Sequence, residues 1–178
     1  MLKLKPIKHK YAHCGPACLQ MVLHYFGINT TQKKLAKIAG TNEIHGTSIR
    51  DMEQTIRSYG FRVVTKRNTT TFDDLRRYVN RLRLPVIVNW YSTFIPPATG
   101  HYSVVTHIDR STITLMDPEI SKHRKMKLVD FNQVWFDFEG DLAFRKPPLN
   151  VDFRIMIVAI PKTGTRAYHL WQQKKQKV

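Results

Sequence analysis

The feature that most constrains the fold is an apolar run, PACLQMVLHYF, over residues 16–26. A helix over these residues carries apolar side chains around most of its circumference, whereas a helix at a protein surface shows one apolar stripe. The run therefore predicts a helix that is buried in the centre of the domain and ends at Gly27. The remaining chain has to surround this helix, and Cys14 lies just before it.

The rest of the sequence places helices first and strands second. Three further helices are expected because each segment begins with a Ser or Thr that can cap it, and two of the three end at a glycine. The later apolar runs are rich in β-branched residues, which favour strands. This order predicts an α+β fold in which the helices pack on an antiparallel sheet. The expected helices cover residues 16–26, 30–40, 48–60 and 70–82, and the expected strands cover residues 61–66, 84–92, 101–109, 112–117 and 153–161.

We expect three less regular segments beside these elements. Residues 130–138 are assigned to a short helix or a turn, and residues 94–100 and 144–150 to turns or loops because they are rich in proline and glycine. Residues 1–160 are predicted to form one domain, and residues 161–178 to form a basic, frayed C-terminal tail. Within this tail Tyr168, Leu170 and Trp171 are a candidate docking patch.

The cysteine count and the N-terminus bear on the compartment. The chain has 178 residues and two cysteines, so disulfides do not organise the fold and a reducing compartment is favoured. The first eleven residues carry lysines where a signal peptide needs an apolar stretch, and no apolar run is long enough to span a bilayer. We therefore expect a cytoplasmic protein without a transmembrane segment, with secretion by a signal-less route as the alternative.

The formal net charge of +16 raises the question of a nucleic-acid partner. The basic residues are spread over residues 3–10, 62–83, 122–127 and the C-terminal tail, and no nucleic-acid motif gathers them. The sequence thus favours a basic, solvated surface over nucleic-acid binding.

Cys14 has four candidate roles: core residue, disulfide partner, metal ligand or nucleophile. Cys18 lies within the apolar run and is predicted to be a core residue. A disulfide between two cysteines on one helix is geometrically poor. A metal site built from neighbouring histidines is disfavoured because Cys18 and His24 project from different faces of the helix; the five residues weighed for this site are His9, His13, Cys14, Cys18 and His24.

The position of Cys14 relative to the helix favours the fourth role. Pro16 suits the first helical position, which makes Gly15 the expected N-cap and places Cys14 at the mouth of the helix. The helix dipole favours a thiolate there by about 0.3–1 kcal/mol, which is less than one pKa unit. A reactive thiol therefore also needs a cation beside it, most simply a histidinium.

His101 is the candidate base, and Asp117 the candidate residue that orients it. His101 begins a predicted strand after a glycine-containing loop, and Asp117 ends the next strand. If residues 109–111 form a three-residue loop, Ile108 pairs with Thr112 and Ser103 pairs with Asp117. His101 and Asp117 then become diagonal neighbours on one face, whereas a two-residue loop sends them to opposite faces.

With these residues located, the chain resembles the bacteriocin-processing cysteine peptidases of the papain-like clan, whose domain precedes transporters for peptides with double-glycine leaders. The resemblance runs over about residues 8–140 through HCGPACLQMVLHYFG, HGTSIRDMEQTIRSYGF, LPVIVNW, GHYSVVTHID, LMDPE and FNQVW, in that order. It implies a papain-like α+β fold, Cys14 as nucleophile, His101 as general acid and base, Asp117 as orienting residue, a peptide or protein substrate, and no metal or other cofactor.

The sequence departs from the family pattern at one position. The family has a glutamine six residues before the cysteine, where it supplies an oxyanion-hole donor, and this chain has Lys8 there, with His9 beside it. Lys8 or His9 is the candidate replacement. Two alternatives to a peptidase that cleaves after small residues such as Gly-Gly remain open: an acyltransferase that uses the same triad, and a peptide-binding pseudoenzyme that has lost turnover.

Overall fold

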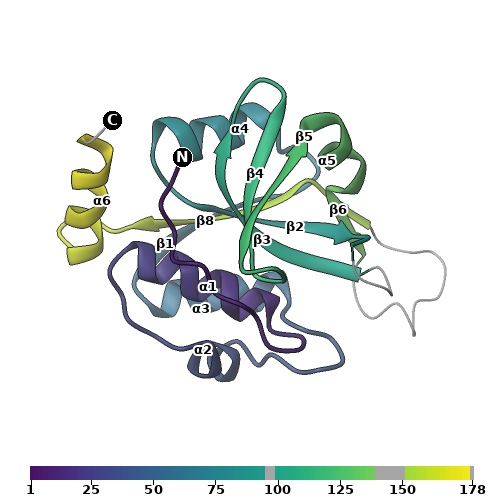
Figure 1. The fold of residues 1–178 in the computed structure, drawn as a ribbon. Helices are drawn as coiled ribbons and strands as arrows, with labels where there is room; N and C mark the ends of the chain where they lie inside the picture. Colours follow the sequence, from purple (N-terminus) through teal and green to yellow (C-terminus); the bar gives the residue numbers. More distant parts are fainter. Residues whose placement is uncertain (95–98, 139–150, 177–178) are drawn as a thin grey trace.

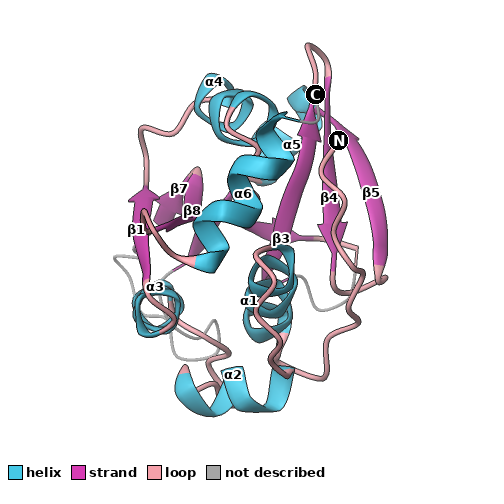
Figure 2. Ribbon diagram, turned by 90° about the vertical axis from the view of Figure 1, so that its left-hand side faces the viewer, coloured by secondary structure: helices cyan, strands magenta, loops and turns pink. Residues whose placement is uncertain are grey.

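The computed structural model describes residues 1–94, 99–138 and 151–176. Its main sheet has six strands, all antiparallel to their neighbours, and a separate two-stranded sheet lies beside it. Figure 2 shows the main sheet with β1 and β5 at its two edges. In sheet order the six strands are β1 (Phe61–Lys66), β8 (Ile155–Pro161), β2 (Val86–Ser92), β3 (Thr99–Ile108), β4 (Thr112–Asp117) and β5 (Lys122–Lys127), and the small sheet pairs β6 (Phe136–Phe138) with β7 (Val151–Phe153).

Helices cover the sheet on both sides. In Figure 1 the helices α1, α2 and α3 lie below the sheet, and α4 and α5 lie above it. Consecutive residues of the central strands are buried, as expected for strands that are covered on both faces. The helices are α1 (Cys14–Tyr25), α2 (Gln32–Ile38), α3 (Ile49–Ser58), α4 (Phe72–Arg76) continuing into the π-helix η1 (Arg77–Arg81), α5 (Leu128–Val134) and α6 (Arg166–Gln176). The α+β fold is therefore as predicted.

The predicted caps start three of these helices. The side chains of Thr31 and Ser48 accept hydrogen bonds from the third residue of α2 and of α3. Thr71 and Asp74 form a reciprocal capping box at the start of α4. These local signals fixed the helix starts correctly.

The start of α1 differs from the prediction. The helix begins at Cys14 with His13 as N-cap, so Pro16 is the third helical residue and not the first, and Gly15 is not the N-cap. Proline is tolerated anywhere in a first turn because those N–H groups have no intrahelical acceptor. The expected central burial is confirmed, since nine of the twelve residues of α1 are buried.

Several elements of the second half were not predicted. The charged sequence KHRKMK forms β5, and residues 130–138 divide between α5 and β6. The predicted strand 153–161 is broken at Arg154, which has a positive φ of 51° and separates β7 from β8. The loop assigned to residues 144–150 and most of the turn at 94–100 lie outside the described residues.

The C-terminal segment is helical and packed where we expected a frayed tail. Helix α6 places Trp171 against the core with 9% of its surface exposed, and the indole N–H donates to the Leu82 carbonyl at 2.6 Å. Lys174 lies over the ring of Tyr25 in α1. The amphipathic spacing of Ala167 and Trp171 buries one face, and this burial holds the segment in place.

The hairpin of β3 and β4 reaches the predicted register by an unexpected route. Ile108 pairs with Ile113, so the predicted pair with Thr112 is wrong and four residues lie between the paired positions. A β-bulge at Thr106 then shifts the register by one, and Val104 pairs with Met116 as the three-residue loop would have required. The bulge is fully buried, and its carbonyl accepts a hydrogen bond from the Leu2 N–H at 2.8 Å.

None of the helices in the described part of the chain is long and apolar enough to cross a membrane.

Candidate active site

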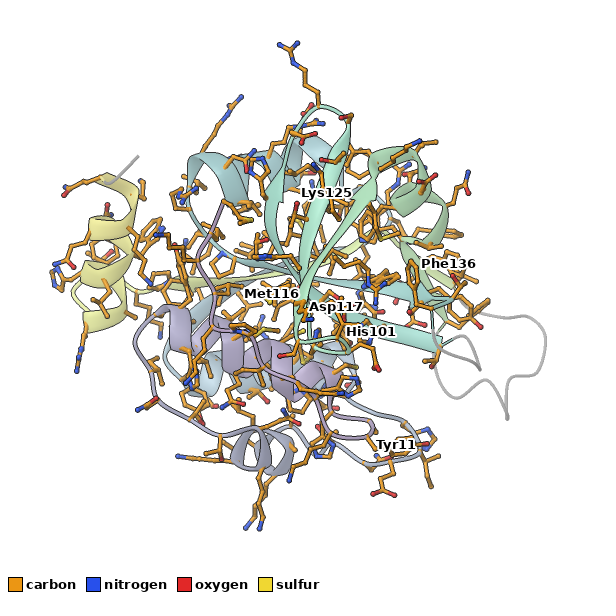
Figure 3. The ribbon with its side chains drawn as sticks, viewed as in Figure 1. Tyr11, His101, Met116, Asp117, Lys125 and Phe136 are labelled. Carbon is orange, nitrogen blue, oxygen red and sulfur yellow. The ribbon has the colours of Figure 1, made fainter. Side chains whose placement is uncertain are left out.

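His101 and Asp117 lie together at the centre of the molecule. His101 comes from the start of β3 and Asp117 is the last residue of β4, and Figure 3 shows the two side by side above α1. The distance between His101 Nε2 and Asp117 Oδ1 is 2.7 Å, and both side chains are almost fully buried. The bulge in β3 is what puts them on one face, because without it the four-residue loop would separate them.

Asp117 is held from three sides. The Arg124 Nε donates to Asp117 Oδ2 at 2.6 Å, and the Glu119 N–H donates to Asp117 Oδ1 at 2.9 Å. Burial alone raises the pKa of Asp117, but the hydrogen bond and charge of His101, followed by Arg124 and the Glu119 N–H, outweigh it and lower the pKa to about 2. Asp117 is therefore a carboxylate with a fixed orientation.

Cys14 interacts with the His101 ring through a side-chain hydrogen bond and through charge. Because His101 Nε2 is engaged by Asp117, Nδ1 is the ring nitrogen left for the thiol. Burial alone lowers the pKa of His101, but hydrogen bonds to Asp117 and Cys14 and the charges of both outweigh it and raise the pKa to about 9. The structure thus brings the three predicted residues together, and the raised pKa favours the protonated form of His101 that the sequence argument required beside the thiol.

The first turn of α1 exposes a hydrogen-bond donor at Cys14. The first intrahelical bond runs from the Ala17 N–H to the His13 carbonyl at 3.0 Å, so the Cys14 N–H lies outside this pattern. Gly15 allows close packing behind the thiol, because a Cβ there would lie 3.0 Å from Met52 Sδ and from Thr47. The glycine at this position is needed for close approach and not for capping.

Cys18 is a core residue, as predicted. It is fully buried one turn after Cys14, and burial raises its pKa well above the ordinary value, with smaller contributions from the charges of Cys14 and Asp117. Both cysteines are free thiols. Over residues 1–94, 99–138 and 151–176, no three His, Cys, Asp or Glu side chains gather in a way that could hold a metal ion.

The two candidate oxyanion donors differ in position. The ring of His9 lies 5.9 Å from the ring of His101, centroid to centroid, and its Nε2 contacts the Glu119 carboxylate. The side chain of Lys8 is exposed. The buried amide of Gln32 fixes this segment, since it donates to the Lys8 carbonyl at 3.1 Å and accepts from the Lys10 N–H at 2.8 Å.

Three residues around the site were missed by the sequence argument. The ring of Trp90 meets the His101 ring edge-on, with 5.6 Å between the ring centroids. Arg124 binds Asp117. Glu119 binds Asp117 through its backbone N–H and His9 through its carboxylate. Arg124 was taken as part of a basic surface because β5 was not predicted. The sequence KHRKMK holds five charged or titratable residues and one apolar residue, so no alternation of apolar and polar residues marks it as a strand. The alternation of exposed and half-buried positions is visible only in the folded chain.

Comparisons with known proteins converge on one protein family. The model of the peptidase C39 family matches residues 7–139. An uncharacterized protein of Methanothermobacter thermautotrophicus is 33% identical over 110 residues, which cover 61% of this chain and 67% of that protein. The lactococcin-G-processing and transport ATP-binding protein LagD of Lactococcus lactis is 30% identical over 135 residues, which cover 75% of this chain but 17% of LagD.

Solved structures share the fold. The peptidase domain of Streptococcus ComA, a bifunctional ABC transporter involved in quorum sensing, superposes with a TM-score of 0.67 at 24% identity, covering 91% of this chain and 100% of that domain. A double glycine motif protease from a transporter, solved in complex with the leader peptide, superposes with a TM-score of 0.64 at 18% identity, covering 90% and 93% of the two chains.

Proposed function

The chain belongs to the peptidase C39 family, and on that premise we propose that it is a cysteine peptidase in which Cys14, His101 and Asp117 form the catalytic triad. The observation that carries this proposal is the buried pair of His101 and Asp117, which leaves the second ring nitrogen to a thiol at the start of a helix. Such a nucleophile, base and orienting carboxylate is the arrangement used for acyl transfer on several unrelated folds.

The proposed reaction has two steps. The Cys14 thiolate attacks the carbonyl carbon of a peptide, a C–S bond forms, and the C–N bond breaks as His101 gives its proton to the leaving amine. Water then attacks the acyl-enzyme while His101 accepts a proton from it, the C–S bond breaks and the carboxylic acid is released. Throughout, Asp117 holds the His101 ring in one orientation and stabilises its charged form.

The oxyanion that develops in both steps needs two donors. We assign the Cys14 N–H as the first, because it points out of the first turn of α1. His9 or Lys8 is the proposed second donor: His9 lies beside His101, and Lys8 occupies the position of the family glutamine. Replacing Lys8 with Gln should raise the rate, by up to about the 10²–10³ that one donor contributes, if the oxyanion hole is incomplete in the native chain.

The proposed substrate is a peptide or protein that is cleaved after small residues such as Gly-Gly. The relatives support this class, since LagD processes lactococcin G and the superposed protease recognises a double glycine motif. The matched segment spans less than a fifth of LagD, so the transport activity of that protein is not carried over. The proposed place of action is the cytoplasm, where both free thiols stay reduced.

The test compares three forms of the protein on a peptide library that includes Gly-Gly sequences, with products read by mass spectrometry. The native chain and Cys18→Ala should cleave the same peptides, and Cys14→Ala should cleave none. Cys18→Ala is the matched control because it removes the same side chain from the same helix outside the site.

A pseudoenzyme is the second candidate, and Lys8 at the position of the family glutamine favours it. The alkylation rate of Cys14 and the formation of cleaved product, measured together, distinguish a peptidase from a pseudoenzyme. Rapid Cys14 alkylation that continues below about pH 7, with no Cys14-dependent product from any peptide, would favour a peptide-binding protein that keeps the ion pair. Product formation excludes it.

A further inference from the structure

Arg124 has a place in the site that its basic neighbours do not share. It lies in the middle of β5, its Nε donates to Asp117 Oδ2 at 2.6 Å, and its side chain is 14% exposed. The guanidinium also lies over the ring of Phe94, 4.0 Å from the ring centroid. Lys125, the next residue of the strand, is exposed, and side chains of successive residues point to opposite faces.

Arg124 is connected to His101, the proposed base, by two routes of side-chain contacts. Phe94 contacts Trp90 at 6.1 Å, and Trp90 contacts His101 at 5.6 Å, centroid to centroid. His101 in turn binds the carboxylate that Arg124 holds. Arg124 is thus tied to His101 through the carboxylate on one side and through two aromatic rings on the other.

Asp117 shares its negative charge between two cationic partners. One carboxylate oxygen faces His101 and the other faces Arg124, whose guanidinium is always charged. A cation bound to one carboxylate oxygen weakens the electrostatic attraction between Asp117 and the proton on His101. It also restricts rotation of the carboxylate, because both oxygens are engaged.

We propose that Arg124 is a positioning residue which acts through Asp117, fixing the carboxylate and limiting how strongly it holds the proton on His101. This inference rests on the proposed roles of His101 and Asp117. Its consequence is that the base releases its proton more readily than an unshared Asp117 would allow, so that general base catalysis operates at lower pH.

Other titratable groups lie near His101 and are the same in the proteins that are compared. They are Asp117 itself, His9 and its partner Glu119, Asp137 of β6, whose carboxylate lies against Gly100 next to His101 in the chain, and, in the active chain, the Cys14 thiol on α1. A difference in the titration midpoint of His101 between two proteins can therefore be assigned to Arg124, because the other groups near His101 are the same in both.

The test is an NMR titration of the His101 ring in the full chain carrying Cys14→Ala, where no activity is needed and the thiol does not titrate. A His101→Gln variant identifies the signal by its loss. Replacing Arg124 with Gln removes a positive charge that repels the protonated His101 ring. His101 then no longer shares the negative charge of Asp117 with a second cation. The titration midpoint should therefore rise by about half a pH unit or more, a threefold or larger change in proton affinity.

Two further variants make the result specific. Lys125→Gln removes the same charge from the neighbouring position and should move the midpoint by less than about 0.2 pH units, because an exposed charge is screened. Arg124→Lys keeps the charge but loses the planar donor group, so the midpoint should rise less than in Arg124→Gln. It also decides the question if Arg124→Gln does not fold.

The proposal is overturned if the midpoint stays or falls in both Arg124 variants, or if Lys125→Gln moves it as far. In the active chain, the alkaline limit of peptide cleavage should move upward with Arg124→Gln, whereas a purely structural role lowers the rate without moving that limit. Absence of peptide cleavage defeats the proposed function and leaves the titration result standing.

Discussion

The two cysteines of α1 lie one turn apart and have opposite surroundings. Cys14 is partly exposed in the first turn and contacts the His101 ring, whereas Cys18 is fully buried and burial raises its pKa. The helix dipole favours a thiolate at Cys14 over one at Cys18, but by less than one pKa unit, so the dipole alone gives only a small difference. The difference teaches that the reactivity we propose for Cys14 would depend on the strands β3 and β4, because they bring His101 to the first turn of α1 and leave the second turn in the apolar core.

The largest expected effect is the contrast in alkylation itself. In the folded protein at pH 7, iodoacetamide should modify Cys14 at least about a thousandfold faster than Cys18, because Cys18 reacts only through an opening of the core. Peptide mapping after timed quenching measures both rates in one sample. Equal rates would remove the basis for the comparison, and in urea the two rates should converge.

Asp117→Asn should lower the reactivity of the Cys14 thiol and leave that of Cys18 unchanged. The amide offers His101 no negative charge and changes which ring tautomer is favoured, so peptide cleavage should fall by about 10²–10⁴. Alkylation of Cys14 at pH 6 should slow, and Cys18 should stay protected. Asp73→Asn is the matched control, since it makes the same change at an exposed surface carboxylate. Equal losses in both variants would contradict the role of Asp117.

The pH dependence of the free energy of unfolding should reveal the interaction between His101 and Asp117. The pKa of His101 is raised from 6.5 to about 9, so the stability it contributes is fully present below pH 6.5 and is lost as the pH rises through 9. The urea midpoint of the native protein should therefore fall between pH 6.5 and 9.5 by more than that of His101→Gln. The pKa of Asp117 is lowered to about 2, so its contribution is lost on the acid side, below pH 3.8.

A smaller effect is expected from the packing behind the first turn. Gly15→Ala places a methyl group 3.0 Å from Met52 Sδ and Thr47, which should destabilise the protein by about 1–3 kcal/mol. Cys14 alkylation should slow because the first turn shifts, while Cys18 stays buried. Adding Met52→Ala opens space at this contact, so the double variant should be less destabilised than the sum of the two single changes. Strict additivity would show that the contact is not tight.

The smallest effect concerns the turn before Cys14. Ala12 has a positive φ of 56°, which costs an L-residue about 1–2 kcal/mol. Ala12→Gly should raise the unfolding free energy by up to about 1 kcal/mol, since glycine relieves this cost but loses more chain entropy. Ala39→Gly, at an alanine with an ordinary φ of −81°, is the control and should have the opposite sign. Urea denaturation measures both.

Local sequence signals predicted the helical half of the fold. Ser48 and Thr71 mark helix starts because capping depends on a few neighbouring residues, and the apolar run of α1 marks burial. The charged strand β5 was missed because an edge strand needs few apolar residues and often carries lysines. The C-terminal helix was missed because its burial depends on a distant carbonyl, that of Leu82.

The candidate site divides in the same way. Cys14, His101 and Asp117 could be named from motifs and from the pairing of two neighbouring strands. Arg124 could not, because its role depends on a strand that was not predicted and on a contact across the sheet with Phe94. The bulge at Thr106 was equally hidden, since the unpaired residue has no sequence mark distinct from a regular strand.

That bulge makes the facing of His101 and Asp117 depend on strand pairing and not on loop length. Residues that pair across two strands share a face, so a loop shorter or longer by one residue leaves the two side chains together as long as Val104 still pairs with Met116. A slip of β3 that absorbed the unpaired residue into the regular ladder would turn His101 to the face opposite Asp117. The loop can therefore vary in length between relatives, whereas the extra residue beside Val105 has to stay unpaired.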